Sequence, residues 1–316
     1  MQADVIIPVY RPTEKLLRLL EMLKKQTYPV HQVILINTEK KYFDDFARRN
    51  GLEKRFGDFL LVRHISREEF DHGKTRNYGV SLSETPYFVM MTDDAVPVNE
   101  DLVRELMSAF ENPGVGVSYA RQIADKGCGV LESYTRSFNY PEHSCMKSAR
   151  NLEDMGIKAF FASNVCAAYR REFFDELNGF TDHTIFNEDM IYARGLLDAG
   201  YLIAYQAGAM VFHSHNYSAL RQFRRNFDLG VSHALYPQVF AHLPAESEGI
   251  RLVKKSCGYL FSVCRPWLIV KLFWQSGFKY MGYFLGKRHQ KLPRFLVRAF
   301  SLNRQYWEAG EEWEGK

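Results

Sequence analysis

The first half of the chain alternates short apolar runs with segments whose apolar residues recur at helical spacing. An uninterrupted apolar run, typical of a strand buried on both faces, occurs at residues 87–91, and mostly apolar, strand-like runs occur at 3–9, 32–36 and 59–64. Behind Thr13, a good helix N-cap, leucines recur every three or four positions, and a more polar helix over 41–50 ends at Gly51. This alternation predicts an α/β fold with a mostly parallel sheet and helices on both of its faces.

The second half continues this pattern less regularly and then becomes helical. We predict strands at residues 116–121, 160–169 and 209–213, and helices at 99–111, 170–177 and 190–199. Residues 122–157 are weakly patterned and predict a long loop with one short helix, a frequent arrangement for a functional cover. Beyond Ser218 the spacing is helical. We therefore predict one domain over 1–218, with halves of about 1–97 and 98–218, and a helical region over 219–316.

Composition narrows the class of protein. Hydrophobic residues make up 46% and charged residues 25%, as in ordinary globular proteins. The five cysteines form no Cys-x-x-Cys pair, which argues against a disulfide framework or a structural zinc site and favours a reducing compartment. We expect no signal peptide before the first strand, and no spanning helix, because no apolar run reaches about 18 residues.

The basic residues are concentrated near the C-terminus. The formal net charge is only +4, yet Gly249 to Trp307 holds twelve Lys and Arg and no Asp or Glu. Bulky apolar residues alternate with these charges between Leu260 and Leu285, a composition typical of helices that lie in a membrane interface. The alternative is that the apolar residues pack on the rest of the protein or form a homodimer seam, and both arrangements can coexist.

Two adjacent carboxylates, Asp93 and Asp94, directly follow the apolar run at 87–91. In an open α/β sheet, ligands bind just outside the carboxyl ends of the strands, where these residues are expected. They indicate a divalent metal held by Asp94, with Asp93 as a second candidate ligand, against a phosphorylated ligand. The alternative is a solvated turn, in which Asp is common.

Other polar residues are expected at the same edge of the sheet. Asn37 and Glu39 follow the second strand and can bond to a base or ribose, and Lys74 and Arg76 open a helix where they can meet a diphosphate. For Lys74 and Arg76 the alternative is a solvated helix face. Neither Gly-x-Gly-x-x-Gly nor Gly-Lys-Ser/Thr occurs, which argues against a dinucleotide oxidoreductase and a P-loop kinase.

A second acidic pair, Glu188 and Asp189, begins a predicted helix. A carboxylate there is either a general base for an acceptor hydroxyl or a residue stabilised by the helix dipole. His213 and His215 end the last predicted strand, where residues two apart share a face, so both imidazoles can point into one cleft and one can bind a metal.

Together these motifs resemble the family 2 glycosyltransferases, and most closely their bacterial rhamnosyltransferase branch. The resemblance covers nearly the whole chain and rests on residues 5–10, 72–79, 92–97, 187–189, 194 with 200, 211–218, 292–293 and 306–307. It implies a GT-A (Rossmann-like) fold with a C-terminal helical extension and an inverting transfer from a nucleotide-activated sugar. It favours L-rhamnose from dTDP-L-rhamnose, moved to a glycan or lipid-linked acceptor in the synthesis of bacterial surface polysaccharide such as O-antigen.

The resemblance also implies roles for individual residues. Asp189 falls at the catalytic base, and Asp94 with His213 at a site for Mg²⁺ or Mn²⁺, where Asp93 contacts either metal or sugar. The residues expected to bind the nucleotide-sugar are Pro8, Tyr10, Arg11, Asn37, Glu39, Lys74, Arg76, Asp93 and Asp94. Those expected to bind the acceptor are Asn164, Glu188 and His215.

The expected location is the cytoplasm or, peripherally, the inner face of the cytoplasmic membrane. A homodimer is a further expectation, and a nucleic-acid partner is not expected. UDP-glucose, UDP-galactose and UDP-galactofuranose remain alternative donors. A non-catalytic module that binds sugar nucleotides or glycans is the alternative from another class, and the presence of Asp94, Asp189 and His213 argues against it.

Overall fold

The computed structural model describes residues 2–241 and 245–308. The chain forms two compact units. The first comprises Met1–Asp125, Tyr140–Asp182 and Glu188–Ser214. The second comprises Lys126–Asn139, His183–Asn187 and His215–Lys316, so two short segments from the middle of the chain join the C-terminal helices.

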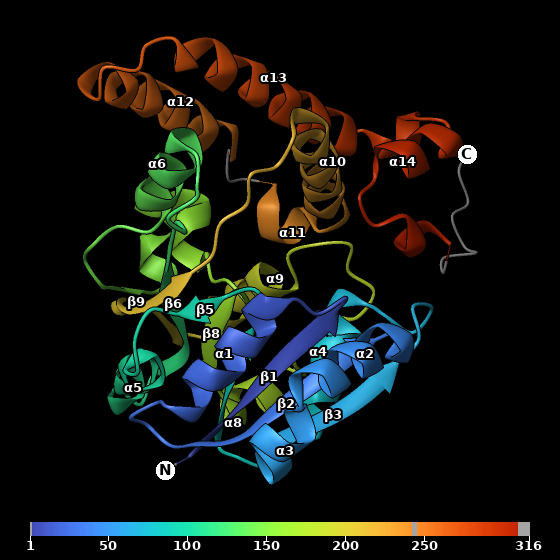
Figure 1. Cartoon of the computed structure of the whole chain (residues 1–316). Coiled ribbons are helices and arrows are strands. Elements are labelled where there is room, and N and C mark those ends of the chain that lie inside the picture. The colour runs from blue at the N-terminus through green and yellow to red at the C-terminus, as the bar shows by residue number, and fades with distance from the viewer. Residues whose placement is uncertain (1, 242–244, 309–316) are drawn as a thin grey trace. The chain divides into compact units, whose positions relative to one another are not determined.

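The first unit is built on a single mixed sheet. Its strands are β1 (Ala3–Tyr10), β2 (Val30–Thr38), β3 (Leu60–Ile65), β4 (Tyr87–Met91), β5 (Val96–Pro97), β6 (Val115–Ile123), β7 (Cys145–Lys147), β8 (Cys166–Arg170) and β9 (Leu202–Phe212). Their order is β3-β2-β1-β4-β8-β6-β9-β5, and β7 pairs with β9. Strands β3, β2, β1 and β4 run parallel, as do β6 and β9, whereas β8 runs antiparallel to both β4 and β6 (Figure 1).

Helices cover both faces of this sheet, as predicted. They are α1 (Glu14–Lys24), α2 (Lys40–Asn50), α3 (Leu52–Phe56), α4 (His72–Ser81), α5 (Leu102–Ser108), α7 (Leu152–Met155), α8 (Arg171–Glu176) and α9 (Glu188–Asp198). Ile7 of β1 belongs to the same buried cluster as the leucines of α1 and the phenylalanines of α2. Ile6 points to the opposite face, where a Cβ on Gly79 of α4 would lie 2.4 Å from it. The α/β prediction is therefore confirmed for this unit.

The predicted helix caps are confirmed. Thr13 is the N-cap of α1, and its hydroxyl accepts a hydrogen bond from the Lys15 amide at 3.3 Å. Gly51 ends α2 in the left-handed conformation at φ 58°, which glycine adopts without steric cost.

The second unit is helical, which confirms the predicted C-terminal extension. Its helices are α6 (Val130–Asn139), α10 (Ala219–Leu235), α11 (Pro237–Phe240), α12 (Ala245–Ser262), α13 (Leu268–Gly286) and α14 (Arg294–Phe300). Helices α10 and α13 cross in close contact at glycines. A Cβ on Gly230 would lie 2.3 Å from the Tyr283 carbonyl oxygen, and one on Gly282 would lie 2.2 Å from that of Phe223. None of the described helices is long and apolar enough to cross a membrane.

Some elements differ from the prediction. The strand expected at 160–169 begins only at Cys166, because Gly156–Phe160 forms a 3-10 helix. The last strand begins at Leu202 rather than at 209, and residues 122–157 contain α6, β7 and α7 instead of a long loop with one short helix. The remaining 3-10 helices are Gly57–Phe59, Ala109–Glu111, Ala149–Asn151, His289–Lys291 and Arg304–Trp307.

Candidate active site

The parallel strands bring several predicted site residues to one edge of the sheet. In the register of β1 with β2, Val9 pairs with Asn37 and Tyr10 with Thr38. Strand β4 lies parallel on the other side of β1, and Asp93 and Asp94 follow its last residue, Met91. The carboxyl ends of β1, β2 and β4 therefore meet at one edge, which is where open α/β sheets bind ligands.

Most of the side chains that follow β1 and β2 already have protein partners. Arg11 donates to the Tyr42 hydroxyl at 3.0 Å and lies over its ring, while Tyr10 packs edge-on against the same ring. Pro8, within β1, is half-buried and pairs with Ile36.

The two polar residues at the carboxyl end of β2, Asn37 within the strand and Glu39 just after it, are also bonded. The Asn37 amide and His64 Nδ1 lie 3.0 Å apart, and Asn37 Oδ1 is buried without a hydrogen-bond partner. Glu39 accepts from the Arg67 amide at 3.1 Å and lies 3.0 Å from the Lys41 amine. Asn37 thus keeps one buried acceptor for which the described residues offer no donor.

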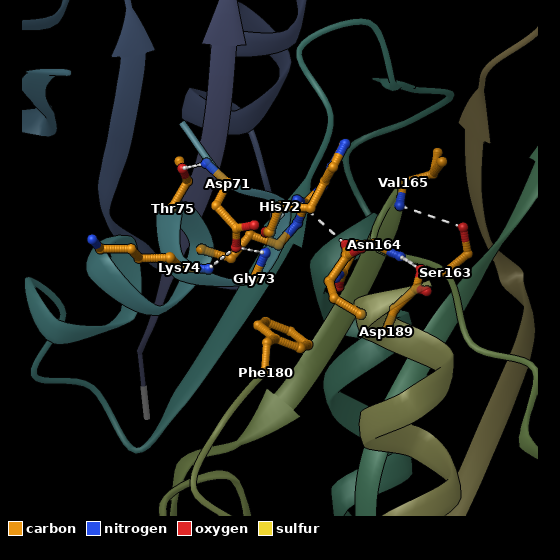
Figure 2. A network of polar contacts seen from close by, with 12 residues as sticks. Asp71, His72, Gly73, Lys74, Thr75, Ser163, Asn164, Val165, Phe180 and Asp189 are labelled. Carbon is orange, nitrogen blue, oxygen red and sulfur yellow. Dashed lines mark hydrogen bonds and ion pairs between the residues drawn. The ribbon is translucent and has the colours of Figure 1, made fainter. Parts of the chain in front are cut away.

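The start of α4 is closed by its own cap. Asp71 accepts hydrogen bonds from the Gly73 and Lys74 amides at 2.9 and 2.8 Å (Figure 2). Gly73 is required there, since a Cβ would lie 1.9 Å from the Thr181 carbonyl oxygen. These amides are therefore occupied by a carboxylate, whereas the Lys74 side chain is exposed.

A buried polar network surrounds Asp189. The backbone amide of Asn164 donates to Asp189 Oδ2 at 3.0 Å (Figure 2), and the side-chain amide of Asn164 donates to Glu188 Oε1 at 3.1 Å. The same Glu188 oxygen lies 3.3 Å from Nη1 of the buried Arg76, which also donates to the His72 carbonyl. Arg76 is thus paired with Glu188, and Asn164 positions both carboxylates of the pair.

The network gives the two adjacent carboxyl groups opposite pKa shifts. Burial, and next the charge of Glu188, raise the pKa of Asp189 well above its usual range. Burial also opposes ionisation of Glu188, but Arg76, His72 and the Asn164 hydrogen bond outweigh it and hold its pKa below the usual value. Glu188 is therefore the ionised partner of Arg76, while Asp189 is suited to exchanging a proton. Opposite shifts in neighbouring groups are typical of acid–base sites.

The second candidate constellation joins Asp94 to His213. His213 Nε2 lies 3.6 Å from Asp94 Oδ1, and His213 Nδ1 lies 2.9 Å from Gln122 Oε1. When the imidazole is neutral and its Nδ1 proton is donated to Gln122 Oε1, Nε2 can offer its lone pair to a cation beside Asp94. Burial and the neighbouring Asp94 raise the pKa of Asp93 to about 7.

Both sites lie in a protein that matches a known family model. The model described as "Glycosyl transferase family 2" matches residues 4–177, which include both Asp93–Asp94 and Asn164. The chain belongs to glycosyltransferase family 2. It is therefore a glycosyltransferase. The predicted family is confirmed.

Two curated relatives of this glycosyltransferase match it over almost its whole length. One is "O-antigen chain rhamnosyltransferase RfbN" of Salmonella typhimurium, 36% identical over 97% of this chain and 96% of the relative. The other is "O-antigen chain rhamnosyltransferase WbaN" of Salmonella anatum, 37% identical over 96% of this chain and 95% of the relative.

Solved structures share the fold at low sequence identity. The mannosyltransferase PcManGT of Pyrobaculum calidifontis, solved with GDP-Man and Mn²⁺, is 14% identical, has a TM-score of 0.56, and is matched over 97% of this chain and 85% of its own. TarS 1–349 of S. aureus, solved with UDP-GlcNAc, is 12% identical, has a TM-score of 0.52, and is matched over 92% of each chain. These glycosyltransferases confirm the GT-A fold.

The donor atoms of Asp94 and His213 fit a divalent cation. An Asp oxygen and an imidazole nitrogen that both present electron pairs repel each other at 3.6 Å unless a cation or proton lies between them. Gln122 fixes the orientation of the imidazole, as hydrogen-bond partners of metal-binding histidines commonly do. His215, two residues further along the chain, belongs to the second unit, where its ring stacks on Tyr217 at 4.6 Å.

The sequence did not point to Gln122, Tyr169 or the pairing of Arg76 with Glu188. Gln122 is a polar residue at the buried end of β6, which is the one signal that could have singled it out. The Tyr169 hydroxyl donates to Asn164 Oδ1 at 2.6 Å. Tyr169 is fully buried, and the sequence gives no reason to distinguish such an aromatic residue from the hydrophobic core. The partner of Arg76 lies more than a hundred residues away in the chain, and no local pattern identifies it.

Proposed function

We propose that this enzyme is an inverting rhamnosyltransferase. It moves L-rhamnose from dTDP-L-rhamnose to a glycan or lipid-linked acceptor in the synthesis of O-antigen, with Asp189 as the catalytic base. The relatives named O-antigen chain rhamnosyltransferases support the donor and the pathway. The observation that carries the mechanism is the contrast within the acidic pair, in which Arg76 neutralises Glu188 while Asp189 has a raised pKa.

Inversion needs one carboxylate on the face of the sugar opposite the leaving group. Asp189 accepts the proton of the acceptor hydroxyl while the oxygen of that hydroxyl forms a bond to the anomeric carbon of the sugar. The bond from that carbon to the diphosphate oxygen breaks, and the nucleoside diphosphate leaves with the electron pair. The hydrogen bond from the Asn164 amide fixes the Asp189 carboxylate in one orientation during this step.

Charge on the leaving diphosphate needs a positive partner. Asp94 and His213 would hold Mg²⁺ or Mn²⁺, which would neutralise the diphosphate as it leaves. Lys74, whose side chain is exposed, and Arg76, which is paired with Glu188, are further proposed cations for the donor diphosphate. Pro8, Tyr10, Arg11, Asn37, Glu39 and Asp93 remain proposed donor contacts, and Glu188, Asn164 and His215 proposed acceptor contacts.

We also propose that the enzyme acts at the inner face of the cytoplasmic membrane. Its C-terminal helices expose bulky apolar residues next to basic ones, including Trp267 at 66% and Val270 at 77% exposure. Surface helices of this composition bind the interface of anionic membranes.

Release of nucleoside diphosphate from a panel of donors tests the proposal. The panel contains dTDP-L-rhamnose, UDP-glucose, UDP-galactose and UDP-galactofuranose, each assayed with a cell-envelope glycolipid extract, in Mg²⁺ or Mn²⁺ and in chelator. We expect turnover of dTDP-L-rhamnose, loss of turnover in chelator and recovery with added metal. If only a UDP-sugar is turned over, dTDP-L-rhamnose is not the donor. Full activity in chelator would show that the enzyme needs no metal.

The base is tested by Asp189→Asn, which keeps the shape of the side chain but cannot accept the proton. We expect turnover to fall by at least a thousandfold, at the upper end of what a base supplies. Binding of dTDP-L-rhamnose, measured by thermal shift, should persist. Glu111→Asn, an exposed acid on the same unit, is the control. Near-normal turnover by Asp189→Asn would show that another group is the base.

A further inference from the structure

A large cavity lies entirely within the helical second unit. It has a volume of about 1580 Å³, is open to solvent on one side, and is lined by residues of α6, α10, α12, α13 and the segment His215–Ser218. Pockets for small ligands measure roughly 300–1,000 Å³, so this one can take a considerably longer molecule. Its apolar wall includes Leu131, Leu229, Val253, Leu268 and Leu272.

The charged residues of the cavity are predominantly cationic. Lys254, Arg265, Lys271 and Lys279 line it, against a single carboxylate, Glu132. That carboxylate is already paired with Arg136 at 2.9 Å. A hydrocarbon wall with an excess of positive charge is complementary to a long-chain molecule that carries a phosphate.

Lys279 is the cation most affected by this wall. Burial lowers the pKa of its amine, and Arg225 and Arg136 act in the same direction, while Glu132 opposes them. Among the described residues it forms no ion pair or hydrogen bond. An anionic group in the cavity would therefore stabilise its charged form and gain a charge-assisted hydrogen bond.

We propose that this cavity binds the hydrocarbon chain and phosphate of the lipid that carries the acceptor sugar, with Lys279 as a phosphate ligand. The inference rests on the proposed function, since it assumes a lipid-linked acceptor. It favours the acceptor lipid over bulk phospholipid because His215 and Tyr217, on the cavity wall, follow the candidate metal ligand His213 within four residues of chain. A lipid bound there would contact the segment His215–Tyr217, which begins two residues after His213 in the sequence.

The proposal predicts that the full-length protein binds a soluble isoprenoid diphosphate. We use farnesyl diphosphate in isothermal titration calorimetry, with inorganic diphosphate and farnesol as partial ligands and dioleoylphosphatidylglycerol as the bulk-lipid competitor. We expect farnesyl diphosphate to bind at least tenfold more tightly than either partial ligand, because only it engages both the wall and Lys279. Equal affinity for inorganic diphosphate, or no binding at all, would overturn the proposal.

Two variants and a control locate the site. Lys279→Met removes the charge, and Ser276→Trp fills the cavity from α13; each should weaken farnesyl diphosphate binding at least tenfold. Lys255→Met, an exposed residue of α12 outside the cavity, should leave binding unchanged. Melting temperatures verify that the variants are folded, and since the two act in different ways, unchanged binding by either folded variant would contradict the site.

The competitor and the donor assay separate this inference from the proposed function. Displacement by phosphatidylglycerol at equal concentration would show that the cavity holds bulk lipid and would overturn the assignment to the acceptor. Release of dTDP from dTDP-L-rhamnose does not depend on farnesyl diphosphate. If release fails while farnesyl diphosphate binds with the expected variant effects, the donor proposal is wrong and the lipid site stands.

Discussion

Glu188 and Asp189 are adjacent in sequence, but the protein stabilises the charged form of Glu188 and the neutral form of Asp189. Arg76 lies 3.3 Å from Glu188, so the ionised form of Glu188 is favoured despite its burial. Burial, and next the charge of Glu188, raise the pKa of Asp189, although its carboxylate accepts a hydrogen bond from the Asn164 backbone amide. Since the base must be deprotonated to act, activity should be lost as the pH falls through this raised pKa, well above the ~3.9 of a solvated Asp.

Glu188→Gln tests this coupling. Gln can still accept the Asn164 hydrogen bond, but the charge that adds to the effect of burial on the pKa of Asp189 is gone, and Arg76 is left uncompensated. We expect the acid limb of kcat/KM against pH to move to lower pH. The free energy of unfolding should fall by about 3–5 kcal/mol, as when one partner of a buried ion pair is removed. Glu111→Gln, an exposed control, should alter neither quantity, and an unmoved acid limb in Glu188→Gln would refute the coupling.

The sequence singles out individual candidate residues at this site but does not show how they are connected. Asp93, Asp94, Glu188 and Asp189 stand out because carboxylates directly follow apolar runs or begin helices, which is local information. The pairing of Arg76 with Glu188 depends on α4 and α9 meeting in space, so the sequence suggested a diphosphate ligand for Arg76 instead. Gln122 was missed for the same reason, since its meaning comes from His213, which lies far along the chain.

At the level of elements, helices α10 and α13 pack in close backbone contact. This contact depends on glycine, because Gly282 has the Phe223 carbonyl oxygen 2.2 Å from the position of a Cβ, and Gly286 has that of Phe227 at 2.1 Å. The contacted atoms belong to the backbone and cannot rotate away. A methyl group at either position must separate the two helices.

Gly282→Ala should therefore destabilise the second unit by about 1–3 kcal/mol, the usual cost of overpacking. Gly277→Ala provides a matched control on the same helix, since no atom lies within 4 Å of its Cβ position. It should be neutral or stabilising by about 0.5–1 kcal/mol, because Ala suits a helix interior better than Gly. Thermal unfolding of both variants makes the comparison, and a melting temperature for Gly282→Ala at or above that of Gly277→Ala would contradict the close packing.

Element prediction succeeded where the local pattern is strong. Strand β4 was predicted with its observed bounds because five apolar residues are followed by polar ones. The prediction was less accurate for β9, whose early residues alternate in burial and include Gln206 and Gly208. It was also wrong for the start of β8, because the apolar residues before Cys166 are buried in a 3-10 helix and a loop rather than in a strand.

On the scale of the whole molecule, the change of pattern near Ser218 correctly indicated a helical C-terminal region. The sequence did not indicate that residues 126–139 and 183–187 belong to the same compact unit. These segments join it through packing. Ile185 shares a small buried cluster with Phe227, Val231 and Val297, and Tyr134 of α6 stacks on Tyr259 of α12 at 4.3 Å. Membership of this kind depends on contacts between distant parts of the chain.

The exposed apolar residues of the second unit lead to the membrane prediction. Phe261, Trp267 and Val270, around the junction of α12 and α13, are 63%, 66% and 77% exposed and do not line the cavity. Arg265 and Lys271 lie among them in the chain. If this surface binds an anionic membrane, each basic residue near the lipid contributes on the order of 1 kcal/mol, and salt weakens that part of the binding. The alternative is that the same apolar surface forms a homodimer seam.

Flotation with liposomes decides between them. We expect the protein to float with phosphatidylglycerol-containing vesicles at low salt, and to float less at high salt or with neutral vesicles. A variant with Phe261→Ser, Trp267→Ser and Val270→Ser should lose at least tenfold in vesicle affinity, because burying each large apolar side chain contributes about 1.5–3 kcal/mol when it is complete. Leu220→Ser, a comparably exposed residue on α10, should bind as the parent does. A dimer in light scattering that the triple variant converts to monomer, with no flotation at low salt, would assign this surface to a second copy of the chain instead.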